Sequence, residues 1–277
     1  MSQVWLVTGS SRGLGRAIVE AGLLAGNKVL ATARDIGSLR ELSERYGEQV
    51  KLFALDVTDE SSAAAAVRAA IDAFSSLDVV INNAGYGNLS SVEDTLMSDF
   101  RAQIETNLFG TIIVTKAALP YFRERKAGYF IQFSSVGGRI GPPGRGPYSA
   151  AKWGVEGFSE VLSREVAPLG IKVTIVEPGG FRTDFAGSST ELSEGHPEYD
   201  STVGATARFQ RNYNGKQPGD PKKAAHVIVQ LTQERNPPLR LLLGSDAYAA
   251  VEKNDLARLE EARIWKKLSV STDFETK

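Results

Sequence analysis

Near its start the chain reads Val4-Trp5-Leu6-Val7-Thr8-Gly9-Ser10-Ser11-Arg12-Gly13-Leu14-Gly15. The apolar run is typical of a buried strand, and the residues that follow the glycines have the apolar spacing of one helix face. A loop at this point presents the N–H groups of a helix N-terminus to an anion. Glycine is needed there because any Cβ would hold the backbone away from a pyrophosphate. The stretch therefore predicts a strand, a nucleotide-binding loop with the spacing G-x-x-x-G-x-G, and a helix.

Short apolar runs alternate with helical periods along the rest of the chain, which is the signature of a parallel sheet covered on both faces. The predicted strands are Val4–Val7, Val29–Ala33, Val50–Leu55, Val79–Ile81, Tyr129–Phe133, Val173–Val176 and Leu239–Leu243. After the first helix, which ends at Gly26-Asn27, helices are predicted near 59–74, 97–123, 148–167, 222–234 and 246–268, with Thr58 as the N-cap of the 59–74 helix. No repeat or linker argues for a second domain, so residues 1–277 form one α/β domain.

Two segments of the chain have distinctive patterns of their own. Residues 184–219 are rich in Gly, Ser, Thr and Asn and have no sustained apolar period, which predicts a long functional loop. Residues 246–268 carry apolar side chains at helical spacing. This segment is expected to pack on its own domain, with a partner subunit as the alternative.

Composition narrows the classes of function. The net charge is −1 and no Lys/Arg run is present, so neither nucleic acid nor an anionic membrane is expected as a partner. Without Cys, and with two isolated His residues, no metal site is expected. The first residues lead directly into a strand, and no apolar run approaches the roughly 20 residues that span a bilayer. A soluble cytoplasmic protein is the expectation.

The end of the second strand bears on which nucleotide binds. An acidic residue there would accept hydrogen bonds from the ribose of NAD and repel a 2′-phosphate. Thr32 takes the expected acidic position, and Arg34 follows. Together with Arg12 in the glycine loop, Arg34 favours a phosphate on the ribose, hence NADP. Asp35 weakens this preference if a different register places it beside the ribose.

The motif Tyr148-Ser-Ala-Ala-Lys152 predicts acid–base chemistry. A phenol has an unperturbed pKa of about 10, so a catalytic Tyr needs a nearby cation to stabilise its phenolate. Residues four apart lie on one helix face, which brings Lys152 to Tyr148. Spacing of this kind also arises by chance on ordinary helices, so the motif indicates catalysis only if other motifs of the chain point the same way.

Together with these other motifs, the chain resembles the short-chain dehydrogenase/reductase family over almost its whole length. The matching motifs are Thr8-Gly9-x-x-x-Gly13-x-Gly15, Asp56-Val57, Asn82-Asn83-Ala84-Gly85, Asn107, Ser135, Tyr148-x-x-x-Lys152 and Pro178-Gly179. The resemblance implies a Rossmann-type domain with seven parallel strands in the order 3-2-1-4-5-6-7. It further implies a homodimer or homotetramer paired through the helices near 97–123 and 148–167.

The resemblance also implies a role for each matched residue. Tyr148 would exchange a proton with the substrate oxygen, Ser135 would polarise that oxygen, with Ser134 as the fallback, and Lys152 would hold the nicotinamide ribose. Asn107 would interrupt its helix and hold a water that links Lys152 to solvent. Asp56 and Val57 would contact adenine, Asn82 and Ala84 would line the cofactor and stabilise the sheet, and Thr183 would hold the carboxamide. The expected cofactor contacts are Gly9, Ser11, Arg12, Gly13, Leu14, Gly15, Arg34, Asp56, Val57, Asn83, Ala84, Gly85, Tyr148, Lys152, Pro178, Gly179 and Thr183.

The predicted activity is NADP(H)-dependent interconversion of a carbonyl and an alcohol. Substrate choice is assigned to residues 184–219, helped by residues 138–143, with Phe181, Phe185, Tyr199 and Ile140 favouring a moderately hydrophobic substrate. The block from Ser135 to Gly141 and the extended C-terminus resemble the branch of 17β-hydroxysteroid and retinol dehydrogenases. The alternatives are a non-catalytic NADP(H)-sensing protein, which would lack Tyr148 or Lys152, and a sugar-nucleotide epimerase or dehydratase, which has a different glycine spacing and a larger substrate domain.

Overall fold

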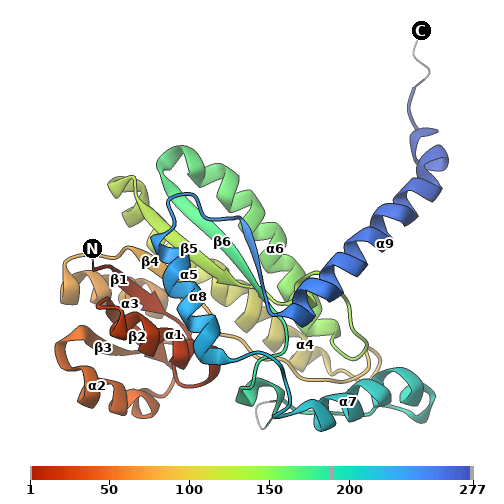
Figure 1. Ribbon diagram of the computed structural model, residues 1–277, viewed down its shortest axis with the longest axis horizontal. Helices are drawn as coiled ribbons and strands as arrows, with labels where there is room; N and C mark the ends of the chain where they lie inside the picture. The colour runs from red at the N-terminus through yellow and green to blue at the C-terminus, as the bar shows by residue number, and fades with distance from the viewer. Residues whose placement is uncertain (1, 188–189, 275–277) are drawn as a thin grey trace.

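Seven parallel strands form a single sheet in the order β3-β2-β1-β4-β5-β6-β7 (Figure 1). The computed structural model describes residues 2–187 and 190–274. The strands are Val4–Val7 (β1), Lys28–Ala33 (β2), Val50–Ala54 (β3), Val79–Asn82 (β4), Gly128–Phe133 (β5), Ile171–Pro178 (β6) and Arg240–Leu243 (β7). Each strand runs parallel to its neighbours. The predicted strands, their order and the Rossmann-type fold are confirmed.

Helices connect the strands and cover both faces of the sheet (Figure 1). They are Gly13–Leu24 (α1), Arg40–Tyr46 (α2), Glu60–Phe74 (α3), Met97–Ile104 (α4), Gly110–Arg125 (α5), Gly146–Val166 (α6), Ala205–Tyr213 (α7), Pro221–Gln233 (α8) and Ser245–Val270 (α9). The predicted N-cap at Thr58 is wrong, because Asp59 precedes α3 and its carboxylate accepts the N–H groups of Ser61 and Ser62. The helix predicted near 97–123 is divided into α4 and α5 by a π-helical segment, Glu105–Phe109.

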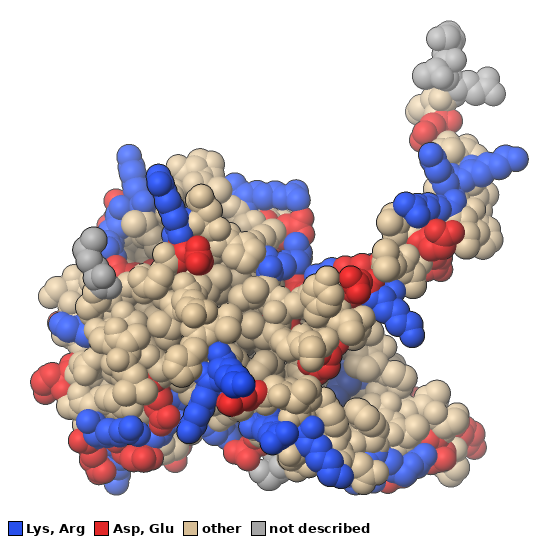
Figure 2. Space-filling view, viewed as in Figure 1, with Lys and Arg blue, Asp and Glu red and all other residues tan. Residues whose placement is uncertain are grey.

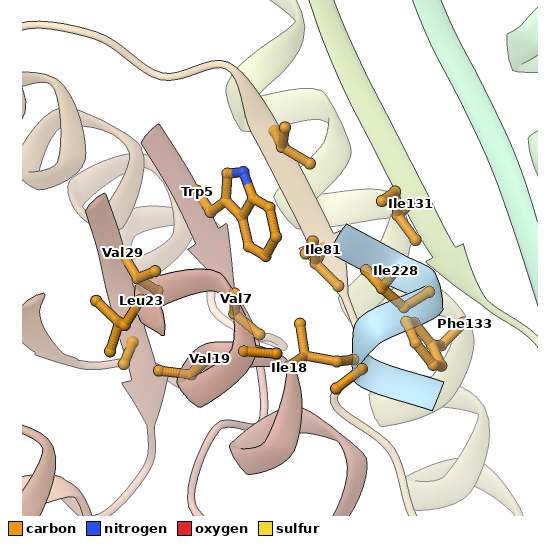
Figure 3. Close-up of a cluster of buried hydrophobic side chains, with 14 of the residues drawn as sticks. Trp5, Val7, Ile18, Val19, Leu23, Val29, Ile81, Ile131, Phe133 and Ile228 are labelled. Carbon is orange, nitrogen blue, oxygen red and sulfur yellow. The ribbon is translucent and has the colours of Figure 1, made fainter. Parts of the chain in front are cut away.

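The alternation of side chains along β1 creates two hydrophobic cores, one on each face of the sheet. Trp5 and Val7 point into a core closed by α1, α2 and α8, where Ile18 of α1 and Ile228 of α8 meet (Figure 3). Leu6, on the opposite face, belongs to a core closed by α3, α5 and α6. Both faces of the central strands are therefore buried, which explains their continuous apolar sequence.

The segment 184–219 is more ordered than its sequence predicts. It contains α7, two 3-10 turns at Asp184–Ala186 and Pro197–Tyr199, and a π-helical turn at Asp200–Gly204. The expectation of a loop without regular structure is wrong. Val203 and Ala207 bury their side chains against Leu89 in a small third cluster, and two such residues are too few to produce a visible apolar period.

Helix α9 leaves the body of the protein after its first turns (Figure 1). Ala247 and Val251 are its buried residues, whereas Leu256, Leu259, Ile264, Trp265 and Leu268 are exposed. The expectation that the whole segment packs on its own domain is therefore wrong for the residues after Arg258, which is the last to contact the domain among those described. Among the described residues, no helix is both long enough and apolar enough to cross a membrane.

Acidic and basic side chains lie beside one another over the surface. On the face shown in Figure 2, Lys and Arg are interspersed with Asp and Glu, including along the projecting part of α9. This distribution agrees with the net charge of −1, since neither sign dominates the visible face.

Removal of residues 260–277 should change the free energy of unfolding by less than about 1 kcal/mol, because the described residues beyond Leu259 are exposed. Ile228→Ala should lower it by about 2–5 kcal/mol, because Ile228 is fully buried between α8 and the sheet. Urea unfolding of both variants measures these changes. If the truncation lowers the free energy of unfolding, and lowers it further at higher protein concentration, α9 packs on a second molecule and is not a free helix.

Candidate active site

A cleft of about 860 Å³ lies along the carboxyl ends of the strands. Its lining includes the residues that directly follow several strands, among them Arg34 after β2, Asn83 after β4 and Gly179 after β6. This is the edge where open parallel sheets bind their ligands, because the helix N-termini and the connecting loops converge there. All seventeen expected cofactor contacts line this one cleft.

The glycine loop between β1 and α1 is shaped by close approaches of the backbone. A Cβ on Gly15 would lie 2.2 Å from the carbonyl oxygen of Gly9, and one on Gly9 would lie 2.8 Å from Cα of Ala84. Gly9 also has φ +69°, which side-chain-bearing residues rarely adopt. The Asn83 amide donates to the carbonyls of Thr8 and Gly9 at 3.0 and 3.2 Å, so the end of β4 holds the loop in place. These contacts form a narrow cradle in front of α1 that fits a pyrophosphate.

The end of β2 supplies a different set of residues from the one expected. Thr32 is buried, and its hydroxyl donates to the Val7 carbonyl at 3.0 Å, so its proposed place beside the ribose is wrong. Ala33 and Arg34 line the cleft instead. Asp35 does not line it, because its carboxylate accepts the Gly37 N–H at 2.8 Å and begins the following turn.

Arg12 and Arg34 both line this end of the cleft and are exposed. Among the described residues, neither has a carboxylate within 4.0 Å. Asp56 lies at the same end, and its Oδ1 accepts the N–H and the hydroxyl of Thr58 at 3.0 and 2.8 Å. Two guanidinium groups without carboxylate partners fit the phosphate of an adenosine 2′-phosphate.

Asn82 is buried inside the sheet rather than in the cleft. Its amide donates to Thr115 Oγ1 at 3.0 Å and to Gln132 Oε1 at 2.8 Å. The expectation that Asn82 lines the cofactor is wrong, because the alternation along β4 turns its side chain toward α5 and turns Asn83 toward the glycine loop. Its expected role in stabilising the sheet agrees with these bonds.

Tyr148 and Ser135 meet at the inner part of the cleft. Tyr148 lies in the first turn of α6 and is buried, whereas Ser135 follows β5 and its hydroxyl accepts the Gly137 N–H at 3.0 Å. Burial raises the pKa of Tyr148, and the Ser135 hydroxyl and the positive charge of Arg145 partly lower it. The serine whose hydroxyl lowers the pKa of the Tyr148 phenol is therefore Ser135 rather than Ser134.

Lys152 lies one turn after Tyr148 on the same face of α6, as its spacing predicts. Its ammonium donates to the Phe133 carbonyl at 2.7 Å and lies 5.8 Å from the centre of the Tyr148 ring. Burial lowers the pKa of Lys152 to about 8, and the Glu156 carboxylate partly opposes this change. The proposed effect of Lys152 on the acidity of Tyr148 stays a prediction, since Arg145 is the cation that lowers the pKa of Tyr148 in this structure.

Asn107 lies behind the cleft, in the π-helical segment between α4 and α5. Its amide donates to the carbonyls of Tyr86 and Gln103, both at 2.8 Å, and its oxygen accepts the Tyr86 N–H at 3.0 Å. The predicted interruption of the helix is confirmed. A Cβ on Gly85 would lie 2.4 Å from Asn107 Oδ1 and 3.5 Å from Lys152 Nζ, which brings Asn107 close to the lysine.

The opposite wall comes from the segment after β6. Pro178, Gly179 and Thr183 all line the cleft, and a Cβ on Gly13 would lie 3.4 Å from Cβ of Thr183. Thr183 therefore faces the glycine loop across the cleft. Its hydroxyl oxygen also accepts the Phe185 N–H at 3.4 Å, which begins the turn Asp184–Ala186.

Aromatic side chains surround the outer part of the cleft. Phe181 and Phe185 line it as predicted, and the Phe185 ring lies 5.6 Å from that of Tyr148. Tyr199 and Ile140 do not line the cleft, and the Tyr199 hydroxyl donates instead to Glu93 at 2.7 Å. Their place is taken by residues that the sequence analysis missed, chiefly Tyr86, Arg145, Thr206, Phe209, Gln210, Tyr213 and Gln217. Several of these belong to α7, a short helix of nine residues that buries only Ala207 and Gln210.

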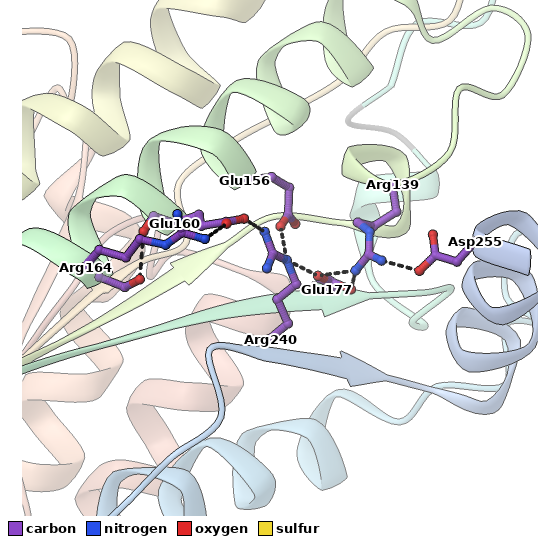
Figure 4. Close-up of polar contacts among 8 residues, drawn as sticks. Arg139, Glu156, Glu160, Arg164, Glu177, Arg240 and Asp255 are labelled. Carbon is purple, nitrogen blue, oxygen red and sulfur yellow. Dashed lines mark hydrogen bonds and ion pairs between the residues drawn. The ribbon is translucent and has the colours of Figure 1, made fainter. Parts of the chain in front are cut away.

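A buried carboxylate supports the loop that carries Ser135. Glu177, the last residue before Pro178, is fully buried and accepts two hydrogen bonds from Arg139 Nη1 at 3.0 and 3.1 Å (Figure 4). Arg139 also pairs with Asp255 of α9, and the Asn254 amide donates to the Arg139 carbonyl at 3.1 Å. The foot of α9 is therefore joined to the loop that follows Ser135.

Glu177 also lies close to a residue of β7, the strand at the edge of the sheet. Arg240 of β7 lies 3.5 Å from Glu177 and donates to Glu156 at 3.0 Å and to Glu160 at 2.8 Å (Figure 4). Both of these glutamates belong to α6, which also carries Lys152. The network thus connects α6, β6, β7 and α9 behind the cleft.

Comparison with known proteins agrees with this geometry. A family profile described as short chain dehydrogenase matches residues 3–193. Oxidoreductase BOA17 of Botryotinia fuckeliana is 47% identical over 275 residues, which cover 98% of this chain and 100% of that protein. The 3-ketodihydrosphingosine reductase of Bacteroides thetaiotaomicron is 36% identical over 246 residues, which cover 87% of this chain and 88% of that protein.

Solved structures show the same fold over the whole domain. The crystal structure of a short-chain dehydrogenase from Streptomyces avermitilis superposes with a TM-score of 0.92 at 40% identity, covering 99% of this chain and 100% of that one. ElxO with NADP bound superposes with a TM-score of 0.74 at 25% identity, covering 90% and 100% of the two chains. The cleft, the sheet order and these relatives together place the protein in the short-chain dehydrogenase family of oxidoreductases.

Proposed function

We propose that the protein is an NADP(H)-dependent oxidoreductase that interconverts a ketone or aldehyde with the corresponding alcohol. The observation that carries this proposal is the meeting of Tyr148, Ser135 and Lys152 in the cleft that also contains the glycine loop. A phenol, a hydroxyl and an ammonium at one place supply a proton donor, a hydrogen-bond donor to the substrate oxygen and a fixed positive charge. A protein that only senses the nucleotide has no need of this combination.

The preference for NADP rests on charge at the adenosine end of the cleft. Arg12 and Arg34 would bind the 2′-phosphate, and Ala33 offers no carboxylate to repel it. The structure of ElxO with NADP bound supports this proposal by similarity. The glycine cradle in front of α1 would hold the pyrophosphate, and Thr183 on the opposite wall would hold the carboxamide.

The bound nicotinamide would supply or accept the hydride at the carbonyl carbon. Tyr148 would donate its proton to the carbonyl oxygen during reduction, while the Ser135 hydroxyl polarises that oxygen. Burial raises the pKa of Tyr148 in the protein without cofactor, and Arg145 and Ser135 both offset part of that rise. Lys152 is fixed by the Phe133 carbonyl, where its remaining N–H groups would bind the ribose hydroxyls.

The substrate is proposed to be moderately hydrophobic. The rings of Phe209 and Tyr213 stack with their centres 5.0 Å apart, and both residues line the cleft with Phe181 and Phe185. Similarity to a 3-ketodihydrosphingosine reductase supports a ketone with an apolar part. The proposed likeness to the 17β-hydroxysteroid and retinol dehydrogenase branch rests on the block from Ser135 to Gly141. A homodimer or homotetramer is also proposed, paired through α4, α5 and α6.

The Arg12→Ala/Arg34→Ala double variant should bind NADPH about 10- to 100-fold more weakly and NADH nearly as before, because only NADPH carries the phosphate. Isothermal titration of both cofactors measures this change. Arg16→Ala is the matched control, since Arg16 pairs with Glu20 and Glu41 outside the cleft. Tighter binding of NADH than of NADPH by the unaltered protein would refute the cofactor proposal.

Tyr148→Phe should bind NADPH normally and lose turnover by about 10²- to 10⁴-fold, because it removes only the proton donor. A panel of ketones and aldehydes, followed by the absorbance of NADPH, measures turnover. Tyr199→Phe is the control, since the Tyr199 hydroxyl bonds Glu93 away from the cleft. Full turnover by Tyr148→Phe would refute the proton-donor role, and cofactor binding without turnover on the whole panel would favour a sensing protein.

Lys152 should make the cofactor-free protein more stable as pH rises from about 8 to about 10. Its pKa is lowered from 10.5 to about 8 in the folded state, so the unfolded chain binds more protons in this interval and stability increases with pH. Urea unfolding at several pH values measures the slope. Lys152→Met should remove this part of the slope, and an unchanged slope would show that the lysine keeps its ordinary pKa.

A further inference from the structure

Arg145 is a cation that lines the cleft close to Tyr148. It lies at the start of α6, three residues before Tyr148, and is half-buried. Among the described residues it has no carboxylate within 4.0 Å, whereas the partly buried Arg139 and Arg240 each pair with two or more. Of the acidic residues that line the cleft, neither Asp56 nor Asp184 pairs with Arg145. A guanidinium removed from water without a counter-charge is costly, which favours an anion beside it.

The hydrogen bonds of Arg145 leave part of its guanidinium available. Nη1 donates to the Gly87 carbonyl at 3.0 Å, and Nη2 donates to Gln210 Oε1. A guanidinium has five N–H groups in one plane, so these two bonds fix its orientation and leave others for a ligand.

Two buried glutamines that line the same cleft have amide atoms without hydrogen-bond partners. Arginine can only donate, so Gln210 turns its oxygen toward Arg145, and its Nε2 is then without a hydrogen-bond partner. Gln210 is 7% exposed. Gln217 is 1% exposed, and both of its amide atoms are without a partner. Both glutamines line the same cleft, and buried polar groups of this kind are normally hydrogen-bonded.

We propose that Arg145 and Gln210 form a subsite for a carboxylate on the substrate, with Gln217 as a further hydrogen-bonding group. The substrate class is then a keto acid, or the matching hydroxy acid, with a moderately hydrophobic chain. One uncompensated cation matches the single charge of a carboxylate better than the larger charge of a phosphate. The aromatic residues at the outer part of the cleft contact the chain. This inference rests on the proposed reductase activity and adds the chemical class of its substrate.

Arg145 also lowers the pKa of Tyr148, so its effect on catalysis must be separated from its effect on binding. Keto acids and their methyl esters separate the two, because each pair has the same ketone and differs in charge. A cation that acted only through Tyr148 would affect both members of a pair equally. A cation that binds the carboxylate affects the acid alone.

The experiment measures kcat/KM with NADPH for 3- and 4-acetylbenzoate, for linear keto acids of five to ten carbons, and for all the methyl esters. The unaltered protein should prefer at least one acid to its ester by about tenfold or more. Arg145→Gln should lower that acid-to-ester ratio by about 10- to 100-fold. Gln210→Glu should lower it as well, because the new carboxylate pairs with Arg145 and repels the acid. Arg211→Gln, which removes an exposed arginine paired with Glu194, should leave the ratio unchanged.

The inference is overturned if every ester is used as well as its acid, or if Arg145→Gln lowers both members of a pair equally. In either case turnover itself still supports the proposed function. If Arg145→Gln does not fold, Gln210→Glu decides the matter. If no compound is turned over, titration of the same acids into the NADP-bound protein decides it: binding that Gln210→Glu abolishes supports the subsite without the reductase, and absence of binding overturns the subsite.

Discussion

The hydrogen bond from Lys152 Nζ to the Phe133 carbonyl is the contact on which the site depends. It joins α6 to the end of β5, so it sets the distance between the helix that carries Tyr148 and the loop that carries Ser135. The ammonium is buried, and removal from water lowers its pKa to about 8. A group held at this cost is retained where its position matters more than its contribution to stability.

The parts that surround this contact come from separate segments of the chain. Asn107 holds Tyr86 in place from the π-helical turn behind the cleft, and Asn83 holds the glycine loop in front of it. Glu177 fixes Arg139 and Arg240 on the far side. Asn107 and Glu177 are buried and Asn83 is half-buried, and each is bonded to backbone or to opposite charge, which fixes the walls of the cleft without filling it.

The cleft has two ends of different character. At the adenosine end, Arg12 and Arg34 are exposed on the rim, where charge can meet a phosphate in water. At the proposed substrate end, Arg145 is half-buried near Tyr148 and lines the cleft with several aromatic residues. Its electrostatic effect on neighbouring groups is stronger there, because water screens it less. Its position explains why it lowers the pKa of Tyr148, and it is the reason for our proposal that it also binds the substrate.

The sequence by itself determined the sheet, the glycine loop and the Tyr148 and Lys152 pair, because these depend on short apolar runs, on the helical period of 3.6 residues and on spacing along one helix. It also predicted a role for Arg34, which does line the cleft, although it placed Thr32 on the wrong side of β2, since the facing of one residue depends on where the strand begins. It did not reveal α7, a nine-residue helix that buries only Ala207 and Gln210. Tertiary structure alone decided that Arg145, Gln210 and Gln217 share one cleft, that Asp35 turns away from it and that α9 projects from the body. These outcomes depend on contacts between residues far apart in the chain, and no local pattern records them.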